Sequence, residues 1–124
     1  TIRSELLSRE LDFAGILPVV PSSKRQEDVM HLIYENVKAG KPADMNRFRR
    51  VQQELFDCGA EVIVLGCTEF SLIKRDENIG PGFLDVMEVL ARETVIRSGK
   101  KLKPKYETLL GGGDIHAAQY SGVS

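Results

Sequence analysis

Hydrophobic and polar residues alternate along the chain in blocks that predict helices separated by short apolar runs. Residues 62–65, Val-Ile-Val-Leu, form an unbroken apolar run between Gly59 and Gly66, and three of the four are β-branched. A run of this kind, bounded by glycines, is typical of a short strand buried on both faces of a parallel sheet. The pattern therefore predicts a central strand at 62–65, with Cys67 just past its carboxyl end.

The start of the chain carries a helical pattern followed by a second apolar run. Leu7, Leu11 and Ala14 recur at helical spacing, which predicts a helix over residues 2–13. The run 16–20, Ile-Leu-Pro-Val-Val, comes next. Because proline cannot donate a hydrogen bond to a sheet ladder, this run predicts a strand that is short or lies at a sheet edge.

Two amphipathic helices are predicted between residues 23 and 58. Ser23 and Gln26 form a capping-box pattern at the start of the first, which ends at Gly40. Asp44 opens the second, and Gly59 follows its end as a left-handed stop. The predicted apolar stripes consist of Val29, Met30, Ile33 and Val37 in the first helix and of Met45, Phe48, Val51 and Leu55 in the second.

The chain beyond Cys67 predicts a shorter series of elements. Residues 68–73 suit a short helix or turn, and the charged, Gly/Pro-rich stretch 74–82 suits a loop. Phe83 and Leu84 predict the remnant of a strand, after which Asp85, with Glu88, provides an acidic cap for a last helix over 86–98. From residue 100 onward no periodicity is visible, which predicts a loosely ordered tail over 100–124.

The order of these elements predicts an α/β fold with mostly parallel strands and right-handed crossovers. Only two or three strands are predicted, which is few for a parallel sheet that has to be covered on both faces. The chain also opens directly on a helical pattern without an initiator methionine. We therefore expect the chain to be a fragment of a larger protein.

Charge and cysteine content narrow the function classes. Seventeen basic and eighteen acidic side chains leave a net charge of −1, which does not favour nucleic acid or an anionic membrane as the main partner. Arg47, Arg49 and Arg50 are predicted to face water, since no aromatic residues or nucleic-acid module accompany them. The two cysteines have neither metal-site spacing nor the density of a disulfide scaffold, and no signal peptide or long apolar span is visible. These features predict a cytoplasmic protein with free thiols.

Cys67 is the strongest candidate for chemistry in the chain. Ligands of open parallel α/β sheets bind outside the carboxyl ends of the strands, where this residue is predicted to lie. If residues 68–73 turn helically, the amide dipoles of that turn point at the sulfur and stabilise its thiolate. The alternative is an inert thiol, because free cysteines are usually buried for packing, and we predict that Cys58 is such a small buried hydrophobe.

The segment Gly66-Cys67-Thr68-Glu69, with the apolar run before it, resembles the cofactor-independent aspartate/glutamate racemase family. Glutamate racemases typically carry histidine at the position of Glu69, so the resemblance is to the aspartate-type branch. Residues 1–4, 33–40 and 83–91 also resemble segments of these racemases.

This resemblance, which covers residues 1–98, implies the fold of the whole chain. The expected architecture is a parallel-sheet three-layer α/β/α fold of the aspartate/glutamate racemase type, represented by roughly one lobe plus the return helix. Residues 1–82 would form the second lobe, residues 83–99 the return strand and helix toward the first lobe, and residues 100–124 the tail.

The resemblance also implies a mechanism in which two cysteines flank the substrate Cα, one removing a proton from one face and the other returning a proton to the opposite face. Cys67 matches the second-half cysteine, and Glu69 would hold or polarise it. Thr68 would donate hydrogen bonds to the substrate α-carboxylate, Lys38 would bind a substrate carboxylate, and Thr1 would add a further hydrogen bond. Neither pyridoxal phosphate nor a metal is implied.

No residue of the chain matches the first-half cysteine, which leaves three interpretations. The leading one is the carboxyl-terminal portion of an amino-acid racemase, inactive alone, that acts on a small dicarboxylic amino acid, aspartate more than glutamate. Its expected partners are the missing amino-terminal half and a second copy of the chain. The others are a related single-cysteine enzyme, either a decarboxylase or hydantoin-racemase-like, and an inactive fragment that serves as an interaction module. By default Lys38 is a helix-end lysine and Glu69 a cap of the following turn.

Overall fold

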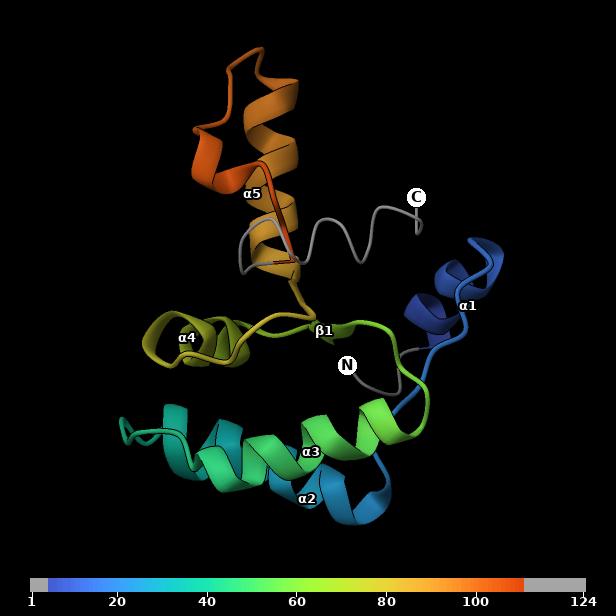
Figure 1. The fold of residues 1–124 in the computed structure, drawn as a ribbon, viewed down its shortest axis with the longest axis vertical. Helices are drawn as coiled ribbons and strands as arrows, with labels where there is room; N and C mark the ends of the chain where they lie inside the picture. Colours follow the sequence, from blue (N-terminus) through green and yellow to red (C-terminus); the bar gives the residue numbers. More distant parts are fainter. Residues whose placement is uncertain (1–4, 111–124) are drawn as a thin grey trace. The chain divides into compact units, whose positions relative to one another are not determined.

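The computed structural model describes residues 5–110 and divides the chain into two compact units, one ending at Ala60 and the other beginning at Glu61 (Figure 1). The elements, in chain order, are α1 (Glu5–Phe13), α2 (Ser23–His31), the π-helix η1 (Leu32–Val37), α3 (Met45–Asp57), β1 (Ile63–Leu65), α4 (Thr68–Asp76), β2 (Phe83–Asp85), α5 (Val86–Arg97) and the 3-10 helix η2 (Pro104–Tyr106). The predicted helices and the α/β class are confirmed within the described residues. Thr1 and the part of the predicted tail beyond residue 110 lie outside them.

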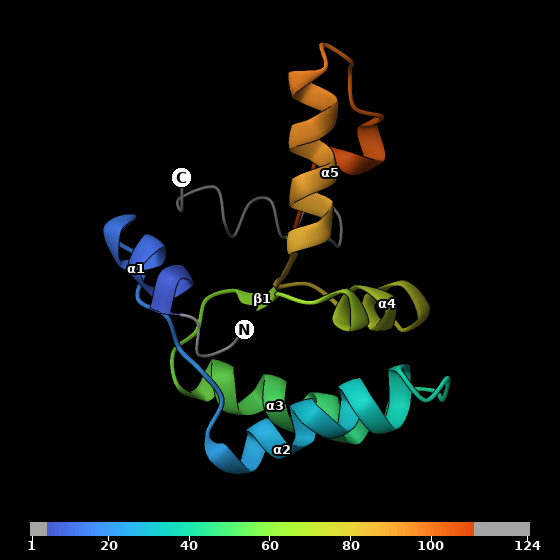
Figure 2. The ribbon, with the colours of Figure 1, turned by 180° about the vertical axis from the view of Figure 1, so that it is seen from behind.

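The first unit is built on α2, η1 and α3, and the two views in Figures 1 and 2 agree that α2 and α3 lie side by side. The hydrophobic core of this unit contains Val29 from the first predicted stripe, Leu32 beside that stripe, and Phe48 and Leu55 from the second stripe. Met30 was predicted in the stripe, but its side chain is 49% exposed. Met30 follows Val29 directly, and consecutive helical side chains point about 100° apart, so both cannot face the same partner.

One of the two N-caps of these helices is the predicted residue, and the other lies one residue before the predicted position. Asp44 caps α3 as predicted, accepting hydrogen bonds from the backbone of the first helical turn, and Gly59 follows α3 with φ +90°. The cap of α2 is Ser22 rather than the predicted Ser23, with its hydroxyl accepting from Arg25 N at 3.4 Å. Ser22 also donates its N–H and O–H groups to the Glu54 carboxylate at 2.8 and 2.7 Å. This contact with α3 selects the cap, and a local pattern could not show it.

The strand predicted at 16–20 is wrong. Those residues form neither a helix nor a strand, and Leu17 is 86% exposed. Pro18 and the following Pro21 remove two backbone donors. In addition, the two strands of the described part of the chain, β1 and β2, pair with each other.

The second unit contains a two-stranded parallel sheet in which Ile63 pairs with Phe83 and Leu65 with Asp85. The central strand is present as predicted, but the prediction that both its faces are buried is wrong. Ile63 and Leu65 are buried, whereas Val64 between them is 51% exposed. Successive side chains of a strand point to opposite faces, so only one face of β1 is covered.

The helices of the second unit flank these strands in sequence. Helix α4 runs on to Asp76, so the loop predicted from residue 74 begins three residues later, at Glu77. Helix α5 begins at its predicted cap, Asp85, whose side chain accepts a hydrogen bond from Met87 N. Among the helices of residues 5–110, none is long and apolar enough to cross a bilayer.

Candidate active site

Cys67 occupies the turn that joins β1 to α4. The strand ends at Leu65, Gly66 follows, and Cys67 is the N-cap residue of α4 with extended backbone angles, φ −137° and ψ 158°. Its side chain is partly exposed. The predicted helical turn after the cysteine is confirmed, which places the thiol at a helix N-terminus beyond the carboxyl end of a parallel strand.

The electrostatic environment of the thiol differs from the prediction. Burial is the largest effect and raises the pKa of Cys67, while the backbone N–H of Phe70 lowers it. The Glu69 carboxyl raises the pKa further by hydrogen bonding and by charge, and the Glu69 N–H lowers it. The net pKa lies above the ordinary value. The amide groups of the helix turn favour the thiolate, as predicted, but burial and the neighbouring carboxylate outweigh them.

Two further polar side chains stand beside the cysteine on the first turn of α4. Thr68 is exposed, and its hydroxyl oxygen lies 3.2 Å from Glu69 Oε2 in a hydrogen bond. Glu69 is partly exposed. The structure thus brings a thiol, a hydroxyl and a carboxylate together at one βα junction, which is a set of groups able to bind a charged ligand and to transfer a proton.

A second pair of polar residues, not singled out as site residues by the sequence analysis, supports this turn from the neighbouring strand. Ser71 donates its hydroxyl to Asp85 Oδ1 at 2.7 Å, and Asp85 is only 3% exposed. The signal for this contact was available in part, because the carboxyl ends of parallel strands meet at one edge of a sheet. Asp85 is the last residue of β2 and pairs with Leu65, the last residue of β1. Cys67 follows Leu65 by two positions.

Comparison with known families places this site in context. The family of Asp/Glu/hydantoin racemases matches residues 1–94, which include both strands and the Cys67 turn. The chain belongs to this racemase family. The predicted family and its α/β fold type are therefore confirmed, and a racemase-like function is supported. No solved structure matches the chain.

Of the other two predicted site residues, Lys38 belongs to the first unit, whereas Cys67 belongs to the second. Lys38 follows the π-helix η1 in the first unit, where its Nζ lies 4.7 Å from the centre of the Tyr34 ring. Its backbone N–H donates to Ile33 O at 2.9 Å and closes the last turn of η1. Thr1 lies outside the described residues. The roles of Lys38 and Thr1 stay predictions.

The other cysteine of the chain, Cys58, is exposed, so the prediction that it is buried is wrong. Cys58 ends α3, where its N–H bonds to Glu54 O and the chain reverses at Gly59. Among the described residues, no group of three or more His, Cys, Asp or Glu side chains could hold a metal ion.

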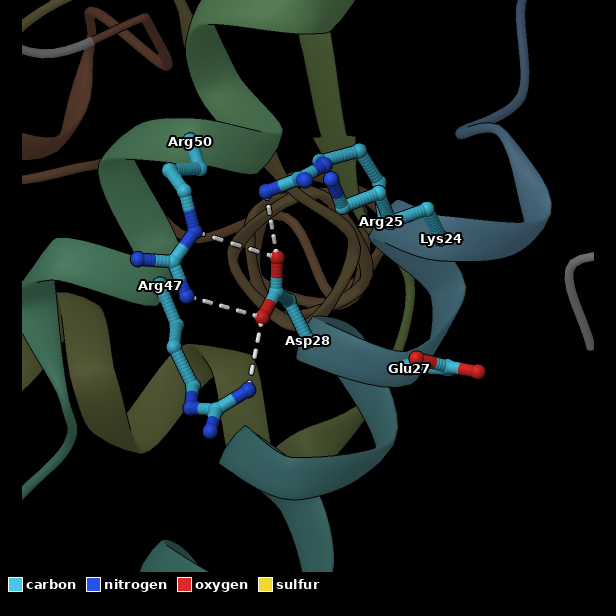
Figure 3. Close-up of a pocket in the computed structure, with 6 residues that line it drawn as sticks. All are labelled: Lys24, Arg25, Glu27, Asp28, Arg47 and Arg50. Atoms are coloured by element: carbon cyan, nitrogen blue, oxygen red, sulfur yellow. Dashed lines mark hydrogen bonds and ion pairs between the residues drawn. The ribbon is translucent and has the colours of Figure 1, made fainter.

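A second charged cluster lies in the first unit of the racemase chain (Figure 3). Asp28, 4% exposed, accepts hydrogen bonds from Arg25 and Arg47 at 2.7 Å each and from Arg50 at 3.0 and 3.4 Å. Arg50 is exposed, as predicted, and Arg47 is partly exposed, but both also reach the buried Asp28, a contact that the prediction did not include. An open cavity of about 360 Å³ is lined by Lys24, Arg25, Glu27, Asp28, Arg47 and Arg50. The Asp28 carboxylate already accepts hydrogen bonds from all three arginines. We therefore interpret the cluster as a clasp, meaning a set of ion pairs that joins α2 to α3.

Proposed function

We propose that this racemase chain supplies one of two acid/base groups for proton transfer at the Cα of a free amino acid, without pyridoxal phosphate. The observation that carries the proposal is the position of Cys67 beyond β1, at the start of α4 and beside Glu69 and Thr68. Aspartate is the proposed substrate rather than glutamate, because Glu69 stands where glutamate racemases typically carry histidine.

The proposed step at Cys67 uses both protonation states of its thiol. The thiolate takes the Cα proton, forming an S–H bond while the C–H electron pair moves into the substrate α-carboxylate. In the reverse direction the neutral thiol donates its proton to the same face. The raised pKa of Cys67 favours the neutral thiol in the free protein. A substrate ammonium beside Glu69 would offset the carboxylate charge that raises this pKa, so binding would favour the thiolate.

Substrate binding is proposed to use the residues around the same turn. Thr68, at the N-terminus of α4, would bind the α-carboxylate, since a helix N-terminus favours anions. Lys38 would bind the side-chain carboxylate of aspartate, and Thr1 would donate an additional hydrogen bond.

The second acid/base group is proposed to come from a partner. The resemblance assigns only Cys67 within this chain, and two-sided proton transfer needs a group on each face of the planar intermediate. The proposed partner is an amino-terminal racemase half, with a homodimer as the assembly and the cytoplasm as the compartment. This chain alone should then exchange the Cα proton with solvent without inverting the substrate.

Proton exchange in deuterated water tests the proposal. The full chain is incubated with L- or D-aspartate, and deuterium incorporation and optical purity are followed by NMR and chiral chromatography. We expect slow incorporation into one enantiomer with retention of configuration, lost in Cys67→Ala and kept in the control Cys58→Ala. No exchange in the unaltered chain, or equal exchange in Cys67→Ala, would refute the role of Cys67. Exchange with inversion would refute the need for a partner.

A related single-cysteine decarboxylase is the second candidate, favoured by the raised pKa of Cys67. A thiol that is neutral at physiological pH is ready to protonate the carbanion left when CO₂ departs. The two candidates differ in their substrates: release of CO₂ from an arylmalonate, without proton exchange into aspartate, would favour the decarboxylase. Lys38→Ala should weaken the binding of a dicarboxylic amino acid far more than the binding of an apolar substrate.

A further inference from the structure

Asp85 connects three elements of the second unit through one carboxylate oxygen. Its Oδ1 accepts the Ser71 hydroxyl at 2.7 Å and the Met87 N–H at 2.9 Å, and the residue is 3% exposed. Ser71 belongs to α4 and Met87 to the first turn of α5, while Asp85 itself ends β2. A buried carboxylate without such donors would be costly, so these contacts hold Asp85 in place.

Ser71 carries this connection to the residue that bears the thiol. Its N–H donates to Cys67 O at 3.3 Å, and its Oγ lies 3.5 Å from the same carbonyl oxygen. On the other side, Asp85 is the sheet partner of Leu65. The path from Leu65 across to Asp85, then to Ser71 and back to Cys67, therefore closes a small loop around the exposed Gly66.

We infer that Asp85 is a positioning residue for Cys67, acting through Ser71 to fix the first turn of α4 beneath the sulfur. The inference rests on the proposed acid/base role of Cys67. The first turn of a helix lacks partners for its N–H groups and frays readily, so a side-chain tie at Ser71 restrains it.

The restraint matters because Glu69 and Phe70 lie between Cys67 and Ser71. The backbone N–H groups of Glu69 and Phe70 are the groups that lower the pKa of the thiol, against burial and the Glu69 carboxyl. Cys67 makes no side-chain capping hydrogen bond, so these amides act on the sulfur through the dipoles of the helix turn. If the turn loosens, this effect weakens and the thiolate fraction falls. A direct effect of the Asp85 charge would have the opposite sign, because removing a nearby negative charge favours the thiolate.

Alkylation of Cys67 measured against pH separates these two effects. The full chain is treated with iodoacetamide, and each cysteine is followed by peptide mass spectrometry, with Cys58 as an internal reference. We expect Ser71→Ala and Asp85→Ala to slow Cys67 alkylation at pH 7.5 by about threefold, with the midpoint of the profile moved to higher pH. Asp85→Asn keeps an acceptor oxygen for both donors and should restore the unaltered profile.

The control is Ser98→Ala, which removes a comparable hydroxyl bond, from Ser98 Oγ to Val95 O at 2.7 Å, at the other end of α5. This variant should leave the Cys67 profile unchanged. The inference is overturned if Ser71→Ala leaves the profile unchanged, or if Asp85→Asn and Asp85→Ala both speed alkylation. Should Asp85→Ala fail to fold, as judged by circular dichroism, Ser71→Ala and Asp85→Asn still decide.

The alkylation profile reports the thiol and not turnover. If Ser71→Ala shifts the profile while the unaltered chain exchanges no proton of aspartate, the positioning role stands and the proposed function fails. If proton exchange depends on Cys67 but Ser71→Ala leaves the alkylation profile unchanged, the proposed function stands and the positioning role fails.

Discussion

Replacing Asp28 by asparagine should destabilise the first unit of the chain by about 2.5 kcal/mol at neutral pH. The substitution keeps the size of the side chain but removes the charge on which three guanidinium groups converge (Figure 3). These groups join α2 to α3, so their loss should weaken the packing of the two helices.

The magnitude depends on how well each arginine is shielded from water. The Arg25 side chain is 12% exposed, so its bond to Asp28 counts as a shielded, charge-assisted one of about 2 kcal/mol. Arg47 is 32% exposed, and we discount its ion pair to about 0.5 kcal/mol for solvent screening. Arg50 is 49% exposed, and we count no stabilisation for its ion pair. Asparagine retains one acceptor oxygen, which keeps the expected cost below the roughly 5 kcal/mol reached when a fully buried pair is broken.

The pH dependence has a definite sign. The hydrogen bond from Arg50, followed by that from Arg47, holds the pKa of Asp28 below its ordinary value, although burial opposes them. Because the folded-state pKa lies below the unfolded value of about 3.9, this stabilisation is complete above about pH 5. It is lost as the pH falls through the unfolded pKa toward the folded one. The difference between the unaltered chain and Asp28→Asn should therefore shrink between pH 5 and pH 3.

Urea unfolding followed by the amide NMR signals of Leu32 and Leu55 reports the first unit. The control is Asp57→Asn, the same chemical change at an exposed residue of the same unit, which should alter the free energy of unfolding by less than about 0.5 kcal/mol. A cost below about 1 kcal/mol for Asp28→Asn, or a cost that stays constant down to pH 3, would refute the clasp interpretation.

Three further predictions use other parts of the chain. Replacing Leu32, which is 0% exposed, by alanine should lower the free energy of unfolding by about 2–5 kcal/mol in the same urea experiment. A change near zero would contradict the place of Leu32 in the core. Near pH 7 the partly buried Cys67 should react with iodoacetamide more slowly than the exposed Cys58. Glu69→Gln should speed the reaction of Cys67, since the Glu69 carboxyl raises its pKa; slower reaction would contradict that assignment.

Local sequence patterns sufficed for elements whose determinants are local. The Asp44 cap, the Gly59 stop and the Asp85 cap each depend on a side chain or backbone conformation within the same turn. The apolar run before Gly66 likewise marks β1, and the Gly-Cys-Thr-Glu segment places Cys67 at the βα junction. These positions could be read without knowing any neighbour in space.

Contacts between distant residues explain what the sequence could not supply. Arg47 and Arg50 appear as solvated charges until α3 packs on α2 and brings them to Asp28, 19 and 22 positions earlier. The exposure of Val64 depends on which face of β1 the rest of the unit covers. The sign of the Cys67 pKa shift depends on the balance between burial, the Glu69 carboxyl and two amides, and the helix N-terminus alone gave the opposite sign.

The π-helix η1 has a consequence for how this chain tolerates insertions and deletions. Its wide turn, closed by the i to i+5 bond from Lys38 N to Ile33 O, accommodates one residue more than an α-helical turn. Removing a single residue within 32–37 would let the helix continue with α pairing, which keeps the phase of the residues after it but abolishes the wide turn that orients the side chains inside it. Asn36, whose side chain receives the Asp44 N–H at 2.9 Å, would then no longer meet the start of α3. The length of this stretch is therefore fixed more tightly than its residue types.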